Sequence, residues 1–244
     1  MKFLLGLSLI SCCAQSEKNM THTPMDGTVD VYMVGDSTTF GTGSTTLNGY
    51  RGPLNTQLDA DRTGGAFPGT LLFPQVGNTT SGTAPTDHHR GIPSSTTVVH
   101  IADDLTQLPA VVPASQCIVI VHIGLNDGTS ALLTTQFFDH YMLMIRREHN
   151  LLRSKLPRFI FSKLEYVTTV PNSRIDSMNA DLDRAWIELA REGVEFETMS
   201  WAIPGLPTTD GVHPTDSGYQ QIAVTGPSGF NYRQAFRALI GYPL

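Results

Sequence analysis

The sequence predicts an α/β protein with three layers, in which helices cover both faces of a central parallel sheet. Short apolar runs alternate along the chain with longer segments whose apolar residues recur every three or four positions. Glycine, proline and small polar residues separate these segments, as expected where strands and helices give way to loops. Strands that alternate with helices are typical of a parallel sheet buried on both faces.

Four apolar runs are the clearest candidate strands, and they are residues 29–34, 118–123, 159–161 and 194–196. A fifth candidate at 71–76 contains Pro74, which cannot donate a hydrogen bond to a neighbouring strand. The stretch 77–95 is rich in Gly, Thr, Ser and Pro, and it is therefore predicted to be loop.

The segments between these strands carry helical periodicity. The predicted helices cover residues 48–62, 97–108, 134–155 and 172–192, with one or two more between 215 and 240. Asn172 or Ser173 can cap the fourth helix at its start, and Gly193 is a natural stop after it.

Length and charge limit the function classes. The chain has 244 residues, a net charge of −6 and 40% hydrophobic residues, which is ordinary for a globular protein with one large α/β domain. No group of basic residues is larger than the pair Arg146-Arg147. This argues against nucleic acid as a partner, because nucleic-acid binding requires a basic stripe along the phosphates.

The N-terminal residues have the pattern of an export signal. Lys2 precedes an apolar stretch over 3–10 that is too short to span a bilayer as a mature helix, and small residues follow up to Ala14. Residues 9–12 also resemble a lipoprotein cleavage box, in which Cys12 would be lipidated and would tether the protein to a membrane. A frayed apolar terminus is the alternative.

We therefore expect a signal peptide over 1–14, a polar linker over 15–27, a folded domain over 28–244, and a secreted or cell-envelope location. After removal of the signal, Cys117 is the one cysteine certain to remain, so no disulfide framework is expected. It lies within a strand-like run, where a free thiol usually behaves as a small buried hydrophobe.

Three short blocks carry the chemistry, and they are Gly35-Asp36-Ser37, Gly124-Leu125-Asn126-Asp127 and Asp210-Gly211-Val212-His213-Pro214. The first two follow predicted strands directly. In an open parallel sheet, the loops at the carboxyl ends of the strands form the ligand crevice. Ser37 supplies a nucleophile and Asn126 a hydrogen-bond donor for an oxyanion. The combination predicts ester hydrolysis.

A serine hydroxyl needs a base to take its proton, and His213 is the best candidate. Asp210 lies three residues before it, close enough to bond the imidazole Nδ1 and to fix its tautomer. Asp36 and Asp127 are expected instead to bind loop N–H groups. His88, His89 and His100 raise the alternative of a metal site, but their spacing does not repeat a ligand pattern. His122 is expected to be a core residue.

The three blocks resemble the GDSL, or SGNH, hydrolase superfamily, whose motifs are Gly-Asp-Ser, Gly-x-Asn-Asp and Asp-x-x-His-Pro. The resemblance covers about residues 29–224. It implies a flavodoxin-like α/β/α fold and a triad with Ser37 as nucleophile, His213 as base and Asp210 as its orienting partner. It also implies that the reaction needs no metal or organic cofactor.

The same resemblance implies an oxyanion hole formed by the Ser37 N–H, the Asn126 side-chain amide and an N–H from a further block. Residues 89–94 are similar to the His-x-Gly-x-x-Gly stretch of carbohydrate-esterase-like members, and the second glycine falls on Ser94. A serine can still offer its N–H there, provided that its backbone does not need a positive φ.

The preferred substrate is an O-acetyl group on a polysaccharide, because Gly49-Tyr50-Arg51 and the segment 89–91 resemble acetylxylan-esterase-like members. A lipase, arylesterase or thioesterase acting on short acyl esters is the alternative within the superfamily. A catalytically silent carbohydrate-binding protein is the alternative from another class. Trp201, Ile203 and Leu206 precede the histidine loop and either wall the substrate site or pack in the core.

Overall fold

The computed structural model describes residues 22–83, 85, 87–102, 108–201, 203, 205–227 and 231–242. The predicted signal peptide and Cys12 lie outside these residues. Residues 22–27, which the sequence assigns to the linker, lie against the domain: Met25 is 2% exposed, and its N–H donates to the Ile240 carbonyl. Within the described part of the chain, no helix is long and apolar enough to cross a membrane.

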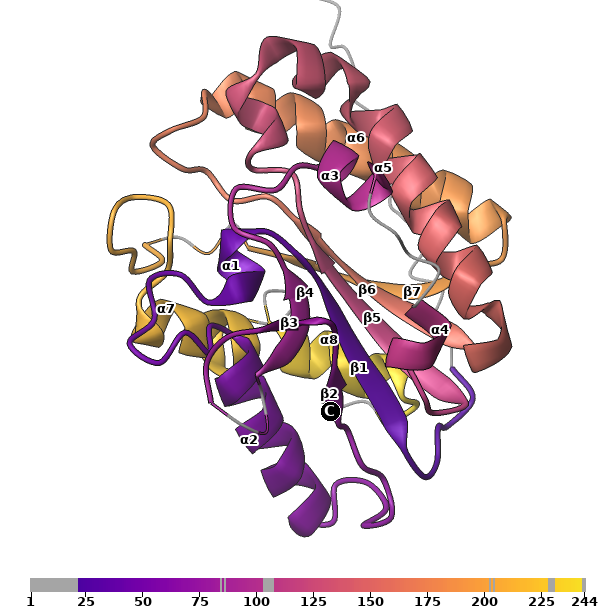
Figure 1. The fold of residues 1–244 in the computed structure, drawn as a ribbon. Helices are drawn as coiled ribbons and strands as arrows, with labels where there is room; N and C mark the ends of the chain where they lie inside the picture. Colours follow the sequence, from indigo (N-terminus) through magenta and orange to yellow (C-terminus); the bar gives the residue numbers. More distant parts are fainter. Residues whose placement is uncertain are drawn as a thin grey trace, which may run out of the picture.

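The centre of the molecule is a mostly parallel seven-stranded sheet (Figure 1). Its strands are β1 (Val29–Gly35), β2 (Gln75–Val76), β3 (Thr79–Thr80), β4 (His88–Gly91), β5 (Gln116–His122), β6 (Pro157–Lys163) and β7 (Glu195–Ser200). They lie in the order β3-β4-β1-β5-β6-β7, and β2 pairs with β1. β2 pairs with the middle of β1 and β4 with its end, so these two short strands share one side of β1. The chain order is that of flavodoxin-like sheets.

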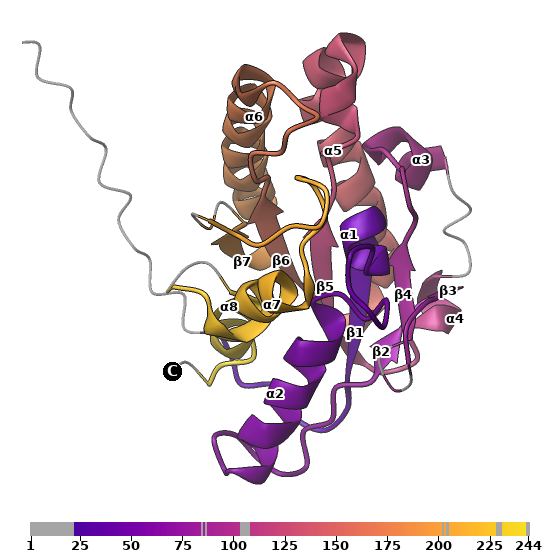
Figure 2. The same ribbon diagram turned by 90° about the vertical axis from the view of Figure 1, so that its left-hand side faces the viewer.

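Helices cover both faces of this sheet. They are α1 (Ser37–Phe40), α2 (Arg51–Thr63), α3 (Thr97–Ala102), α4 (Leu108–Val111), α5 (Ala131–Leu152), α6 (Asn172–Arg191), α7 (Asp216–Gln220) and α8 (Tyr232–Leu239). Shorter turns are η2 (Asp127–Thr129), η3 (Arg153–Lys155) and η4 (Gln221–Thr225). Figures 1 and 2 show α3, α5 and α6 on one face and α2, α7 and α8 on the other. The predicted three-layer fold is confirmed.

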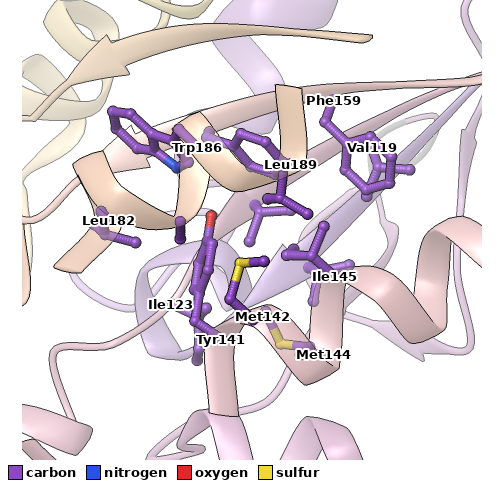
Figure 3. Packing of buried hydrophobic residues seen from close by; sticks show 14 of the residues in the cluster. Val119, Ile123, Tyr141, Met142, Met144, Ile145, Phe159, Leu182, Trp186 and Leu189 are labelled. Atoms are coloured by element: carbon purple, nitrogen blue, oxygen red, sulfur yellow. The ribbon is translucent and has the colours of Figure 1, made fainter. Parts of the chain in front are cut away.

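Alternating residues of each strand supply two separate cores. Tyr32 and Val34 of β1 face a cluster formed with α5 and α6, whereas Val31 and Met33 face a cluster formed with α2 and α8. Figure 3 shows the first cluster, where Val119 lies with side chains of both helices. Because both faces are covered, each strand is apolar on both sides, which explains the continuous apolar runs in the sequence.

The prediction that 77–95 is loop was wrong in part, because the structure has β3 and β4 within this stretch. β4 carries buried polar residues instead of apolar ones. His89 is buried and shares a 2.7 Å hydrogen bond between its Nε2 and Ser81 Oγ, and Arg90 Nη1 donates to Asn78 Oδ1 at 2.7 Å. Both partners flank β3, which precedes β4 in the chain. Because hydrogen bonds allow these polar side chains to be buried, the sequence of β4 has no apolar pattern.

The other predicted elements exist with shifted bounds. The helix predicted over 48–62 is α2, which begins at Arg51. The helix predicted over 97–108 is α3, which ends at Ala102. Residues 103–107 lie outside the described residues. Cys117 is a free thiol buried in β5, as predicted for a cysteine that behaves as a small hydrophobe. Burial raises the pKa of its thiol to about 12.

Candidate active site

Ser37 stands at the point where β1 ends and α1 begins. Asp36 caps this short helix, because its Oδ1 accepts hydrogen bonds from the Thr38 N–H at 3.0 Å and the Thr38 hydroxyl at 2.8 Å. Gly35 lets the turn form: a Cβ there would lie 2.2 Å from both the His122 carbonyl oxygen and Thr39 Oγ1. Asp36 therefore has a structural role, but the N–H that it binds belongs to α1 and not to a loop as predicted.

His213 lies beside Ser37, although 176 positions separate them in the chain. The Ser37 hydroxyl and His213 Nε2 are 2.8 Å apart, and His213 Nδ1 is 2.7 Å from Asp210 Oδ2. Asp210 Oδ1 also accepts from the N–H groups of Val212 and His213, at 3.0 and 2.8 Å. These bonds, led by the His213 N–H, lower the pKa of Asp210 to about 2. The carboxylate is therefore charged at neutral pH and faces the imidazole.

Contacts of the loop after α1 with the histidine loop and with α7, which follows it, bring these residues together. Tyr219 donates its hydroxyl to the Thr42 carbonyl at 2.6 Å, and the Thr45 N–H and hydroxyl both donate to the Asp216 carboxylate. Gly43 adopts a φ of +93°, and a Cβ on it would lie 2.5 Å from the Pro214 carbonyl oxygen. Figures 1 and 2 both show α1 next to the loop that precedes α7.

The segment 92–95 is held against the end of β1. The Ile92 N–H donates to the Gly35 carbonyl at 3.0 Å, and His100 Nε2 donates to the same oxygen at 3.2 Å. Asn126 also contacts this segment, because its Nδ2 donates to the Ser95 carbonyl at 2.9 Å. One hydrogen of that amide remains for another acceptor. The structure thus brings the blocks around Ser37, Ser94 and Asn126 to one edge of the sheet.

Asp127 holds the start of α3, which follows this segment. Its buried carboxylate accepts from the Thr97 N–H at 3.1 Å and from the Thr97 hydroxyl at 2.6 Å. Burial raises the pKa of Asp127, and the bonds from Thr97 oppose that rise. The carboxylate therefore has a structural role, but the N–H that it binds belongs to the first residue of α3 and not to a loop as predicted.

Ser94 does have a positive φ, contrary to the condition for its expected role as an oxyanion donor. Its φ is +61°, in the left-handed region that favours glycine, and its side chain is exposed. For a residue other than glycine this conformation costs about 1–2 kcal/mol. The backbone here therefore keeps the shape that a glycine would adopt, and serine carries the strain.

The histidines considered for a metal site have other partners. His89 Nδ1 accepts from the Gly91 N–H at 2.7 Å, and burial lowers the pKa of His89 to about 3. Burial likewise lowers the pKa of His100 to about 4 and that of His122, which stacks on Trp201 at 3.6 Å, to about 3. His122 is buried in the core, as predicted. Across the ranges that the structure describes, no three His, Cys, Asp or Glu side chains form a metal-binding group.

A pocket of about 470 Å³ lies beside the histidine loop. Its walls come from residues 165–168 after β6 and from residues between Trp201 and Val212 after β7. Trp201, Ile203 and Leu206 all line it, and the same three side chains pack with the core on the side of α2 and α8. Both expectations for these residues, the wall of a site and core packing, agree with these contacts. Sequence reasoning missed Glu165 and its neighbours, although their place directly after a strand of the parallel sheet was a usable signal. A cavity of about 560 Å³ lies between the outer sides of α5 and α6.

Three solved structures share this fold. The family 3 carbohydrate esterase of Clostridium thermocellum has a TM-score of 0.60 and 19% identity, over 80% of this chain and 90% of that one. An acetyl esterase has a TM-score of 0.59 and 18% identity, over 79% and 91%. A family 3 carbohydrate esterase from Talaromyces cellulolyticus has a TM-score of 0.59 and 17% identity, over the same shares. At such identities these likenesses establish the fold alone.

The sequence comparison establishes the family. Residues 33–221 match the GDSL-like lipase/acylhydrolase family, a range that contains all three motif blocks. No curated protein matches the chain significantly. Because the family match extends through most of the domain, the chain belongs to the GDSL-like lipase/acylhydrolase family and is a carboxylic ester hydrolase.

Proposed function

We propose that this esterase removes O-acetyl groups from a polysaccharide through a Ser-His-Asp triad formed by Ser37, His213 and Asp210. The observation that carries the triad is the chain of two short contacts, 2.8 Å from the serine Oγ to Nε2 and 2.7 Å from Nδ1 to the carboxylate. This is the geometry in which an imidazole takes the hydroxyl proton while a carboxylate holds its tautomer.

The reaction proceeds in two halves. In the first, His213 takes the Ser37 proton as Oγ attacks the ester carbonyl, and it then gives that proton to the departing alcohol oxygen. In the second, His213 takes a proton from water as the water oxygen attacks the acyl-serine carbonyl, and it then gives that proton to Ser37 Oγ as the acyl–oxygen bond breaks and the acid leaves. Asp210 stays ionised throughout, because its pKa is about 2.

Three donors would stabilise the oxyanion of each tetrahedral intermediate. The Ser37 N–H is the first of α1, so it has no partner within the helix, and Asn126 Nδ2 keeps one hydrogen beyond its bond to the Ser95 carbonyl. The Ser94 N–H is the third candidate, in the segment held against Gly35. Each such donor contributes about 10²–10³ in kcat in well-studied hydrolases.

The preference for acetylated polysaccharide rests on three points. Tyr50 and Arg51 follow the first block as in acetylxylan-esterase-like sequences, and both are buried beneath it. The segment 89–94 resembles the carbohydrate-esterase-like block, and Ser94, at the place of its second glycine, has a positive φ, which glycine favours. The solved structures that share the fold include two family 3 carbohydrate esterases and an acetyl esterase.

The test measures acetate release from acetylated xylan and hydrolysis of p-nitrophenyl acetate by wild type, Ser37→Ala and Ser173→Ala. Ser173 is an exposed serine at the start of α6, so it controls for loss of a hydroxyl elsewhere. We expect Ser173→Ala to match wild type and Ser37→Ala to lose both activities. Equal rates of hydrolysis for wild type and Ser37→Ala would contradict the proposed triad. A higher rate with octanoyl than with acetyl esters would contradict the polysaccharide substrate and would favour a lipid-like one.

A further inference from the structure

The pocket of about 470 Å³ beside the histidine loop is larger than an acetyl group needs. Pockets of about 300–1,000 Å³ hold drug-sized ligands, so this one has room for a ring with substituents. Gly211 and Val212 form part of its wall, and His213 follows them directly in the chain. The pocket therefore lies against the loop that carries His213.

The chemistry of ester hydrolysis decides which part of the substrate lies on this side. His213 must deliver a proton to the oxygen of the departing alcohol, so that alcohol lies next to the imidazole. A pocket that shares a wall with the histidine loop is consequently placed for the alcohol portion of the ester. In an acetylated polysaccharide, that portion is a sugar ring.

Tyr166 gives the pocket an aromatic surface that is open to solvent. It is 55% exposed, which sets it apart from the buried tyrosines of the core, and it lines the pocket. Its hydroxyl donates to Asp176 Oδ1 on α6, so the tip of the side chain is held in place. The C–H groups of a sugar ring can pack on such a face. Their hydrogens carry a partial positive charge, which the electron-rich face of the aromatic ring attracts.

Polar groups in the same wall suit a ligand with hydroxyl groups better than an alkyl chain. Glu165 is 5% exposed, and neither of its carboxyl oxygens has a hydrogen-bond partner in the described residues. The nearest basic atom is His122 Nε2, at 3.8 Å from Oε2. Burial raises the pKa of Glu165 to about 8, so near neutral pH the carboxyl is protonated and can both donate and accept. Thr168 and Thr208 add hydroxyl groups.

We propose that this pocket is a sugar subsite, in which Tyr166 stacks on the ring that carries the ester and so selects esters of carbohydrate alcohols. This inference rests on the proposed function, because the sugar is the departing alcohol of that reaction. Tyr166 acts here on substrate selection and has no part in the proton transfers at His213.

The experiment measures kcat/KM for acetylated xylan and for ethyl acetate, which has the same acyl group without a sugar. The quantity of interest is the ratio of the two values. In Tyr166→Ala we expect this ratio to fall about tenfold, as loss of a good aromatic contact implies. In Tyr166→Phe most of the ratio should remain, because the ring stays and only the bond to Asp176 is lost. Ile187→Ala removes an equally exposed apolar side chain from α6 and should leave the ratio unchanged.

Binding provides a second readout that does not depend on turnover. In the Ser37→Ala background, calorimetric titration with an acetylated xylo-oligosaccharide should show a weaker Kd when Tyr166→Ala is added, by about the same factor. A Kd and a ratio that both stay unchanged in Tyr166→Ala would overturn the subsite while leaving the triad intact.

Two other outcomes would also overturn the subsite. If Tyr166→Ala reduces kcat/KM for ethyl octanoate relative to ethyl acetate and spares the xylan ratio, then the pocket holds an acyl chain. If wild type releases no more acetate from xylan than Ser37→Ala, while it still hydrolyses ethyl acetate, then the polysaccharide substrate fails and the sugar subsite fails with it. Loss of ethyl acetate hydrolysis in Ser37→Ala separates all these results from a failure of the triad.

Discussion

Replacing Asp36 by asparagine should make the stability of the protein less sensitive to pH. Asp36 is fully buried; its Oδ1 accepts two hydrogen bonds from Thr38, but its Oδ2 has no partner in the described residues. Burial raises the pKa of this carboxyl from 3.8 to about 6. An asparagine can still accept from Thr38 through its carbonyl oxygen, and it carries no charge to desolvate.

The sign and size follow from proton linkage. A raised pKa means that the folded state holds the proton more tightly, so its contribution to stability is fully present below pH 3.8 and is lost as the pH rises through 6. The change in pKa corresponds to about 3 kcal/mol over the whole window, and about half of this lies between pH 5 and pH 7.5. Relative to wild type, Asp36→Asn should therefore gain about 1.5 kcal/mol between these two pH values.

Urea unfolding of both proteins at several values between pH 5 and pH 7.5 measures this difference. Asp61→Asn is the matched control, because Arg233 pairs with Asp61 and the pKa of Asp61 is lowered. Its titration lies below the measured range, so its difference from wild type should stay constant. A constant difference for Asp36→Asn as well would refute the conclusion that Asp36 is charged and desolvated at neutral pH.

Three further changes test the site. Asn126→Ala should lower kcat about 10²–10³-fold with little effect on KM, measured by steady-state kinetics, if its amide binds the oxyanion. Asp210→Asn should lower kcat about 10⁴-fold near neutral pH, because the imidazole loses the partner that sets its tautomer; an unchanged pH–rate profile would argue against this role. Ser94→Gly keeps the N–H and relieves the strain of the positive φ. We therefore expect an unchanged kcat and a free energy of unfolding that is higher by up to about 1 kcal/mol, measured by urea unfolding.

The residues that meet at the site were predictable because each stands in a short block at a place that strand and loop patterns reveal. Ser37 and Asn126 follow strands of one parallel sheet, and parallel strands end at the same edge. Asp210 and His213 are close in the chain, so their pairing needs only a tight loop. The sequence could not show how closely the Ser37 hydroxyl and the His213 ring approach one another, and the structure gives this distance as 2.8 Å.

Other features depend on packing that a sequence does not display. β4 was missed because His89 and Arg90 are buried through bonds to Ser81 and Asn78, and a strand with polar buried residues has no apolar signature. The positive φ of Ser94 is a backbone property that its side chain does not announce.

Glu165 is another residue that sequence reasoning missed. Its buried carboxyl lies beside His122 of β5, in a pocket that Trp201 also lines. Both residues are far from it in the chain, so nothing local in the sequence shows that a charged side chain is enclosed there.

The most direct measurement of the central claim is covalent labelling with a p-nitrophenyl phosphonate, followed by mass spectrometry of the digested protein. The account predicts one adduct, on Ser37, formed with loss of ester hydrolysis and at least 10³-fold more slowly in His213→Ala, roughly the share that a triad base supplies. An active enzyme that carries the adduct on another residue, or that labels Ser37 equally fast without His213, would contradict it.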